Sequence, residues 1–404
     1  MPQVENWQLG RDVAFPYEEA RPERQWAAMF DLNKCIECQT CTLACKTTWT
    51  HEEGQEHMFW NNVETKPFGG HPVGWDQRLL EDLGVNEWSE DGVYTGDTIF
   101  EAEGADWDDP DNHPTEQLAQ VADDITGFLP ETDDLRYPNL GEDESAGESM
   151  TPDTHFDEDT HPIWFFYLPR ICNHCTFAAC AGSCPVQAIY KRQEDGIVLI
   201  DREHCQAYLV CNETCPYKKA QFNYAEGISQ KCVGCYPKTE EGRAPQCFEN
   251  CLGKIRLHGY LNPPDEVEET DPTEGPTNPL DFLVHEKGIA LPLYPQFGLE
   301  PNVYYIPPIT APTSYLEQMF GPGVEEAIQT YREIGDGTHP GLEGILNLMG
   351  STPWSITEFE VADGECIGYY EGDEVGRVPI TEPSVERDRE DEVDGQAVYR
   401  LDVT

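Results

Sequence analysis

The stretch Cys172-x2-Cys175-x4-Cys180-x3-Cys184-Pro185 carries four thiols in one short run. Such runs are typical of ferredoxin-type proteins, in which close thiolates hold one iron–sulfur cluster and the last thiolate reaches a second cluster. Fifteen of the sixteen cysteines fall into four groups of this kind. The other groups are Cys35-x2-Cys38-x2-Cys41-x3-Cys45, Cys205-x5-Cys211-x3-Cys215-Pro216 and Cys232-x2-Cys235-x11-Cys247-x3-Cys251. The spacing therefore predicts a chain that carries electrons through several clusters.

Two other uses of cysteine compete with cluster ligation. A disulfide framework is typical of extracellular chains, but cysteines two or three residues apart suit wrapping around a cluster better than pairing across a fold. Structural zinc fits the group 232–251 when that group is taken alone, because two pairs of cysteines can hold one zinc ion with four thiolates. The run from Cys35 to Cys45 does not close easily around one tetrahedral ion, so it favours sharing between two clusters.

The number of thiols points to the types of cluster. Fifteen thiols make three sets of four and one set of three, and Tyr208 stands where a ferredoxin-type run would offer another cysteine. Because tyrosine is a poor iron ligand beside thiolates, the simplest interpretation is three [4Fe–4S] clusters and one [3Fe–4S] cluster. A cubane with Tyr208 or solvent as its fourth ligand is the alternative. We expect Cys366 to be an ordinary non-ligand and His174 to support or pack against the ligands.

The net charge argues against nucleic acid as a partner and indicates a protein that works in concentrated salt. The chain has 77 acidic and 25 basic residues, a formal charge of −52. This field opposes binding to nucleic acid. Disorder is the other reading of high acidity, but aromatic residues make up 11% of the chain. We expect a halophilic protein, since concentrated salt screens the repulsion between acidic side chains.

The composition divides the chain into five parts. They are a polar N-terminal arm at 1–27, a first cysteine segment at 28–75, an acidic insert at 76–162 that we expect to be a surface excursion, a ferredoxin-like core at 163–261, and a C-terminal extension with an acidic tail at 262–404. Strands are expected at 29–32 and 196–201, and helices at 115–128, 323–334 and 342–349. The first residues do not resemble a signal peptide. No run reaches the ~20 apolar residues that span a bilayer, so no direct membrane span is expected.

Further motifs flank the cysteines, and together they resemble one family. They are Trp49-Thr50, Asn61–Pro67, Tyr167–Cys175, Ala188–Asp201, Cys215–Lys219, Ala290–Pro295 and Tyr304–Pro308. These segments resemble the iron–sulfur β subunits of respiratory nitrate reductase. The same family includes β subunits of molybdenum enzymes that act on selenate, chlorate, perchlorate, dimethyl sulfide and ethylbenzene. The resemblance covers roughly residues 28–75 and 163–310, and it leaves out the acidic insert and the C-terminal hundred residues.

The resemblance implies how the thiols are shared among four sites. Site 1 would hold the [4Fe–4S] cluster nearest the catalytic subunit, sites 2 and 3 two further [4Fe–4S] clusters, and site 4 a [3Fe–4S] cluster nearest the membrane-side donor. The implied ligands are Cys35, Cys38, Cys41 and Cys251 for site 1, Cys45, Cys232, Cys235 and Cys247 for site 2, Cys172, Cys175, Cys180 and Cys215 for site 3, and Cys184, Cys205 and Cys211 for site 4.

The resemblance also implies fold, partners and location. We expect an α+β protein built on two ferredoxin-like modules with long insertions. It would relay electrons between a membrane cytochrome b, or another quinol-side donor, and a molybdenum catalytic α subunit, without a catalytic residue of its own. Typical nitrate reductase β subunits have Trp at the position of Tyr208, whereas several relatives acting on other substrates have Tyr. A peripheral position on the outer face of the cytoplasmic membrane is favoured, through a partner's twin-arginine signal; the cytoplasmic face is the alternative.

Overall fold

The computed structural model describes residues 2–17, 21–67, 69–83, 88–102, 127–131, 134–135, 164–334, 338–380, 389–393 and 396–399. The helix expected at 115–128 lies almost wholly outside these residues. The strands are β1 Gln3–Asn6, β2 Arg11–Ala14, β3 Gln25–Asp31, β4 Asn62–Lys66, β5 Phe166–Arg170, β6 Ile189–Lys191, β7 Val198–Ile200, β8 Ala220–Asn223, β9 Ile228–Lys231, β10 Arg256–Leu261, β11 Leu291–Pro292, β12 Val303–Ile306, β13 Glu358–Ala362, β14 Glu365–Tyr370, β15 Asp373–Pro379, β16 Arg389–Val393 and β17 Gln396–Tyr399. The α-helices are α1 Thr40–Trp49, α2 Trp75–Leu83, α5 Ala179–Gly182, α6 Val210–Thr214, α7 Tyr236–Thr239, α8 Gln246–Glu249, α9 Pro279–Asp281, α10 Thr313–Phe320, α11 Val324–Glu333 and α12 Pro340–Leu348.

A four-stranded sheet in the order β10-β3-β12-β11 joins distant parts of the chain. Strand β3 pairs antiparallel with β10, where Phe30 lies opposite Arg256, and parallel with β12. The side chains of Trp26, Met29 and Phe30 are fully buried, because a strand covered on both faces needs apolar residues at successive positions. The sheet therefore holds β3, which leads into the first cysteine run, beside β10, which follows the last one.

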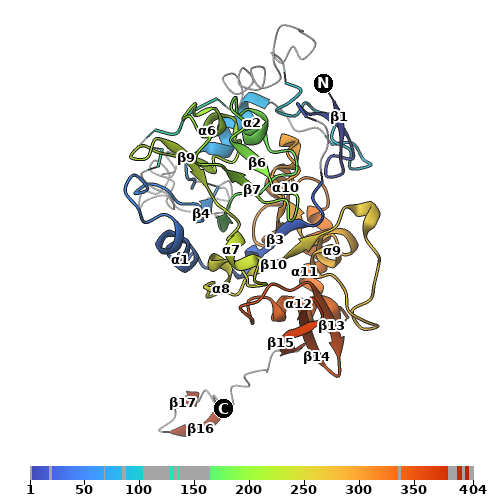
Figure 1. The fold of residues 1–404 in the computed structure, drawn as a ribbon. Helices are drawn as coiled ribbons and strands as arrows, with labels where there is room; N and C mark the ends of the chain where they lie inside the picture. The colour runs from blue at the N-terminus through green and yellow to red at the C-terminus, as the bar shows by residue number, and fades with distance from the viewer. Residues whose placement is uncertain are drawn as a thin grey trace, which may run out of the picture.

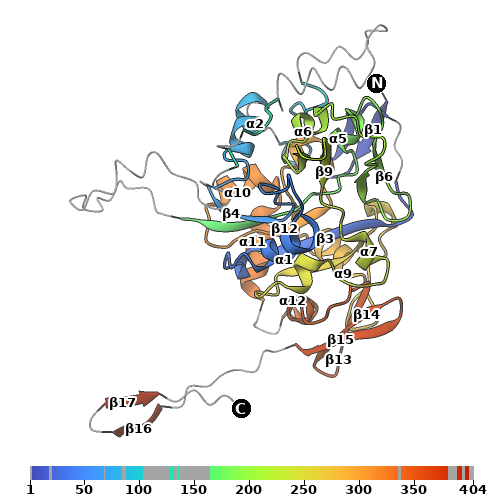
Figure 2. The ribbon, with the colours of Figure 1, turned by 60° about the vertical axis from the view of Figure 1, so that its left-hand side comes forward.

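Short helices carry some of the clustered cysteines or begin directly after one, and two pairs of these helices are in contact. Helix α1 contacts α8, and α5 contacts α6. Both views show α6 well above α1 and α7, so the cysteine helices lie at different heights in the molecule (Figures 1 and 2). Gln39, Leu209 and Cys235 precede their helices with positive φ angles of 56°, 65° and 53°. Such angles are uncommon outside glycine, and here they turn the chain sharply beside a cysteine.

Two expectations about the periphery are wrong. Residues 1–27 are not a polar arm, because β1 and β2 pair and bury Leu9 and Val13 completely. The insert at 76–162 is not wholly a surface excursion, because Ile99 and Phe100 are also fully buried. Periodicity could not reveal either contact, since the covering residues come from distant segments. The strand expected at 29–32 overlaps β3, and the helices expected at 323–334 and 342–349 correspond to α11 and α12.

Much of the C-terminal part, residues 262–404, belongs to the folded core and is not a separate extension. Strands β11 and β12 complete the central sheet, while β13, β14 and β15 form an antiparallel sheet against α12. Strands β16 and β17 pair in a separate hairpin. Within the described residues, no helix combines the length and apolar character needed to cross a membrane.

Candidate iron–sulfur sites

Three small internal hollows are each lined by the thiols of one expected site. The thiols come from segments far apart in the sequence, and the central sheet and the helix pairs bring them together. Site 2 contributes Cys45, Cys232, Cys235 and Cys247 to one hollow, site 3 contributes Cys172, Cys175, Cys180 and Cys215 to the second, and site 4 contributes Cys184, Cys205 and Cys211, with Tyr208, to the third.

The site 1 thiols meet at the start of α1. Cys35 interacts electrostatically with Cys41 and Cys251, and the thiol of Cys38 accepts a hydrogen bond from the backbone of Leu252. A Cβ at Gly253 would lie 2.9 Å from the carbonyl oxygen of Lys34. Only glycine allows this close approach without a shift, so the loop after α8 can lie against the first cysteine run.

Burial makes these thiols unfavourable as free thiolates. Burial, together with neighbouring cysteines, raises the pKa of Cys35 to about 11 and the pKa values of Cys211 and Cys232 to about 12. A bound cation offsets this cost, because metal coordination deprotonates a thiol. All sixteen cysteines lie in the described part of the chain, and all are free thiols. The crowded thiols therefore fit a positively charged iron core.

Backbone amides supply the hydrogen bonds that thiolate ligands accept. The N–H groups of Ala188, Lys219 and Gly234 donate to the sulfurs of Cys184, Cys215 and Cys232 at 3.2, 3.4 and 3.4 Å. The indole Nε1 of Trp49 donates to the sulfur of Cys235 at 3.2 Å. Hydrogen bonds to sulfur raise cluster reduction potentials. Within the described residues, no three Cys, His, Asp or Glu side chains come close enough to hold a single metal ion.

His174 supports the walls of sites 2 and 3. Its Nδ1 accepts a hydrogen bond from the backbone N–H of Val198 at 3.1 Å, so the ring carries its proton on Nε2. Burial holds the pKa of His174 well below its usual value. A Cβ at Gly234 would lie 3.5 Å from Nε2, and the ring packs against Trp26. The neutral imidazole therefore fills the space between the two sites.

Buried charges between the sites were missed by the sequence analysis. Arg170 and Glu64 are fully buried and their side chains are 2.5 Å apart, while Lys66 pairs with Asp76 at 2.5 Å. The strand sequence Asn62-Val63-Glu64-Thr65-Lys66 does contain a pattern that indicates these buried charges. Alternate residues share one face of a strand, and here that face is polar throughout, which indicates partners from other segments.

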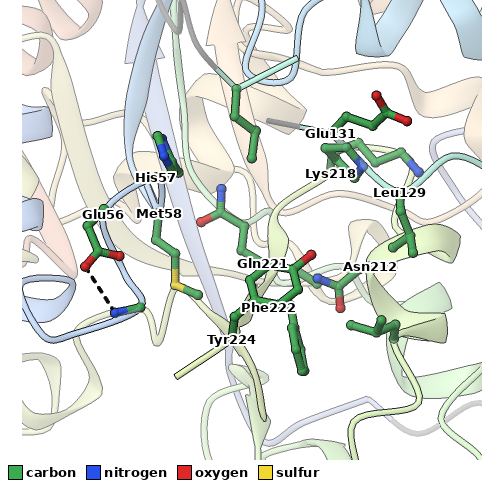
Figure 3. A pocket seen from close by; sticks show the side chains of 15 residues that line it. Glu56, His57, Met58, Leu129, Glu131, Asn212, Lys218, Gln221, Phe222 and Tyr224 are labelled. Carbon is green, nitrogen blue, oxygen red and sulfur yellow. Dashed lines mark hydrogen bonds between the residues drawn. The ribbon is translucent and has the colours of Figure 1, made fainter. Parts of the chain in front are cut away.

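A further hollow, about 670 Å³, is separate from these sites. His57 and Met58 lie on one side of it and Lys218 on the other (Figure 3). Lys218 Nζ donates to the carbonyl oxygens of Phe128 and Glu213 at 3.0 and 2.7 Å. None of the described residues that line this hollow is a cysteine, so it is not one of the four sites.

Comparison with known proteins identifies the family. A model described as a 4Fe-4S dicluster domain matches residues 163–261. The selenate reductase β subunit of Thauera selenatis is 39% identical over 325 residues, which cover 76% of this chain and 90% of the relative. The respiratory nitrate reductase β subunit of Haloferax mediterranei is 40% identical over 366 residues, covering 85% and 96%.

The chain belongs to the iron–sulfur β subunits of nitrate reductase and related molybdoenzymes. The chlorate reductase β subunit of Ideonella dechloratans, 40% identical over 325 residues (76% of this chain and 90% of the relative), is another member. As a β subunit of this family, the chain is an electron-transfer subunit of an oxidoreductase complex. Its mixed helices and strands with a ferredoxin-like 4Fe-4S domain agree with the expected α+β class.

Proposed function

We propose that this β subunit relays electrons through three [4Fe–4S] clusters at sites 1, 2 and 3 and one [3Fe–4S] cluster at site 4. The observation that carries the proposal is that each of three hollows is lined by the thiols of one site. The iron supplies the one-electron chemistry. The chain supplies thiolates, N–H donors to sulfur and a buried environment, which together position the clusters and tune their potentials.

Electrostatic neighbours support one order of the proposed sites. Arg256 interacts with thiols of sites 1 and 2. Cys232 of site 2 interacts with Cys172 of site 3, and Cys180 of site 3 interacts with Cys211 of site 4. Each site therefore lies next to the following one. The inferred path runs from site 4 through sites 3 and 2 to site 1, or in the reverse direction, in one-electron steps.

The two ends of this path differ in their surfaces. Around site 1, Ile36, Leu43 and Leu252 are 65%, 63% and 67% exposed. Beside site 4, Tyr208 is 58% exposed. Exposed apolar groups mark contact surfaces. We place the molybdenum α subunit at site 1 and the membrane cytochrome b, or another quinol-side donor, at site 4.

Nitrate is the proposed substrate of the complex. The nitrate reductase relative from Haloferax matches more of both chains than the selenate and chlorate reductase relatives do, and the charge of −52 fits a halophilic setting. Tyr208 favours the second candidate, a complex acting on selenate, chlorate or another related substrate. The proposed location is peripheral, on the outer face of the cytoplasmic membrane.

Isolation of the native complex tests this proposal. The chain should purify with a molybdenum-containing subunit, and the reduced complex should be reoxidised faster by nitrate than by equimolar selenate or chlorate. Faster oxidation by selenate or chlorate would reassign the substrate and leave the relay intact. A chain that purifies alone, with all its clusters, would be a free polyferredoxin carrier and would contradict the proposed partners.

A further inference from the structure

Arg256, the first residue of β10, has a buried guanidinium with unused hydrogen-bonding capacity. The residue is 2% exposed. Its Nη1 donates to Asn61 Oδ1 at 2.8 Å. Nε and Nη2 have no hydrogen-bond partner within the described chain. The guanidinium carbon lies 4.5 Å from the ring centre of Phe30 and 5.6 Å from that of Phe248, so aromatic faces hold the charged group in place.

The groups facing Arg256 are the thiols of two sites. Cys35, Cys41 and Cys251 of site 1 and Cys247 of site 2 raise the pKa of the guanidinium against the effect of burial. Arg256 in turn opposes the rise in the pKa of Cys45, another site 2 thiol. Asn61 connects the same elements, because its side chain holds Arg256 while its backbone N–H donates to the sulfur of Cys45.

A buried cation needs a negative partner. An unpaired charge in a protein interior costs several kcal/mol, and arginine cannot lose its charge in a protein. The carbonyl oxygen of Asn61 carries no charge, and in the described chain no carboxylate hydrogen-bonds to Arg256 Nε or Nη2. Clusters ligated by four thiolates are anionic. Two such clusters would supply the charge that the protein itself does not provide.

We propose that Arg256 is the shared cation of sites 1 and 2 and that it raises the reduction potentials of both clusters. The proposal rests on the ligand sets proposed above. Each cluster gains one negative charge when it accepts one electron, and a nearby fixed positive charge stabilises that reduced state. Arg256 binds and releases no proton in this step. It is a positioning and tuning residue, and electrons pass from cluster to cluster.

Redox titration of the intact complex, followed by EPR, tests this role. In R256Q the equilibrium between oxidised and reduced cluster should shift at least tenfold toward the oxidised form at sites 1 and 2, about 59 mV for a one-electron couple. Sites 3 and 4 should shift less than threefold. K254Q is the matched control, because Lys254 is an exposed cation two residues away. Its loss should shift every cluster less than threefold, since water screens exposed charges.

Iron content separates the possible failures. A fully loaded R256Q complex with unchanged potentials at sites 1 and 2, or with equal shifts at all four sites, overturns the role of Arg256. If R256Q does not retain iron, R256K carries the test, because lysine keeps the charge. Full loading with potentials within threefold of wild type then supports the proposal, and a tenfold shift or loss of iron overturns it. A wild-type complex with fewer than four clusters contradicts the proposed function instead.

Discussion

Two adjacent asparagines each hold a buried cation, and the two cations have different surroundings. Asn61 accepts from Arg256 and Asn62 accepts from Lys219 Nζ. Lys219 interacts with Cys232 of site 2 and Cys172 of site 3, so it lies in the next gap along the path. Unlike Arg256, it also interacts with the carboxylate of Glu64 and the guanidinium of Arg170.

The surroundings of Lys219 and of Arg256 differ in how their excess positive charge is distributed. The Lys219 side contains three cations, Lys66, Arg170 and Lys219, and two acids, Glu64 and Asp76, so it has the same excess of one positive charge as the Arg256 side. Here the excess is spread over a hydrogen-bonded network. On the Arg256 side it is concentrated on one guanidinium. We therefore expect the Lys219 side to govern folding and the Arg256 side to govern potentials.

Removing Glu64 should have the largest effect on stability. Its Oε1 accepts from Arg170 Nε at 2.6 Å, and its Oε2 accepts from Trp75 Nε1 at 3.0 Å. E64Q leaves Arg170 without its carboxylate partner in the interior, which should cost about 3–5 kcal/mol. The measurement is the denaturant midpoint, followed by loss of cluster absorbance. E374Q, which removes an exposed carboxylate from Arg377, is the control and should not change that midpoint. A shift in E64Q no larger than in E374Q would mean that the network does not govern folding.

Acid should weaken both sides through buried neutral histidines. Burial lowers the pKa of His71, beside Lys219, and of His258, on the strand of Arg256, to about 3. The unfolded chain binds these protons below pH 6.5 and the folded chain does not, so stability falls as pH falls from 6.5. Burial raises the pKa of Asp281 to about 6, which opposes the loss. At pH 5 each of these two histidines should cost about 2 kcal/mol and Asp281 should return about 1 kcal/mol, so these three groups together account for a net loss of about 3 kcal/mol.

Denaturant midpoints between pH 7.5 and 5 check this expectation. Glu64, whose pKa is lowered to about 2, loses its contribution only as pH falls below about 4.5, so it does not contribute in this window. H258Q should retain about 2 kcal/mol more of its pH 7.5 stability at pH 5 than wild type does. An equal loss of stability in both proteins would show that His258 is not held neutral.

Replacing Lys219 should have the smallest of these effects. K219Q removes one positive charge between sites 2 and 3, but Arg170 and Lys66 remain nearby. The reduction equilibria of these two clusters should therefore shift less than tenfold, and site 1 should not respond. EPR-monitored redox titration beside R256Q makes the comparison direct. A larger shift in K219Q than in R256Q would reverse the assignment of roles.

The chemistry could be predicted from the sequence because thiol spacing is a local property. Tyr208 marked the set with three cysteines, and apolar spacing located α11 and α12. The buried charges could not be predicted in the same way. Arg256 is the first residue of β10. The sequence of that strand gives no indication that the Arg256 guanidinium is surrounded by Phe30, Phe248 and the thiols of sites 1 and 2. The fold of residues 1–27 was missed for the same reason, since Leu9 and Val13 are buried by contacts that span the chain.

Iron analysis of the intact complex, together with EPR of its oxidised form, decides whether fifteen thiols hold four clusters. We expect about fifteen irons per chain and the signal of one [3Fe–4S]⁺ centre, with three further centres appearing on reduction. About eight irons per chain, zinc in stoichiometric amount, or no [3Fe–4S]⁺ signal in a fully loaded sample would contradict it.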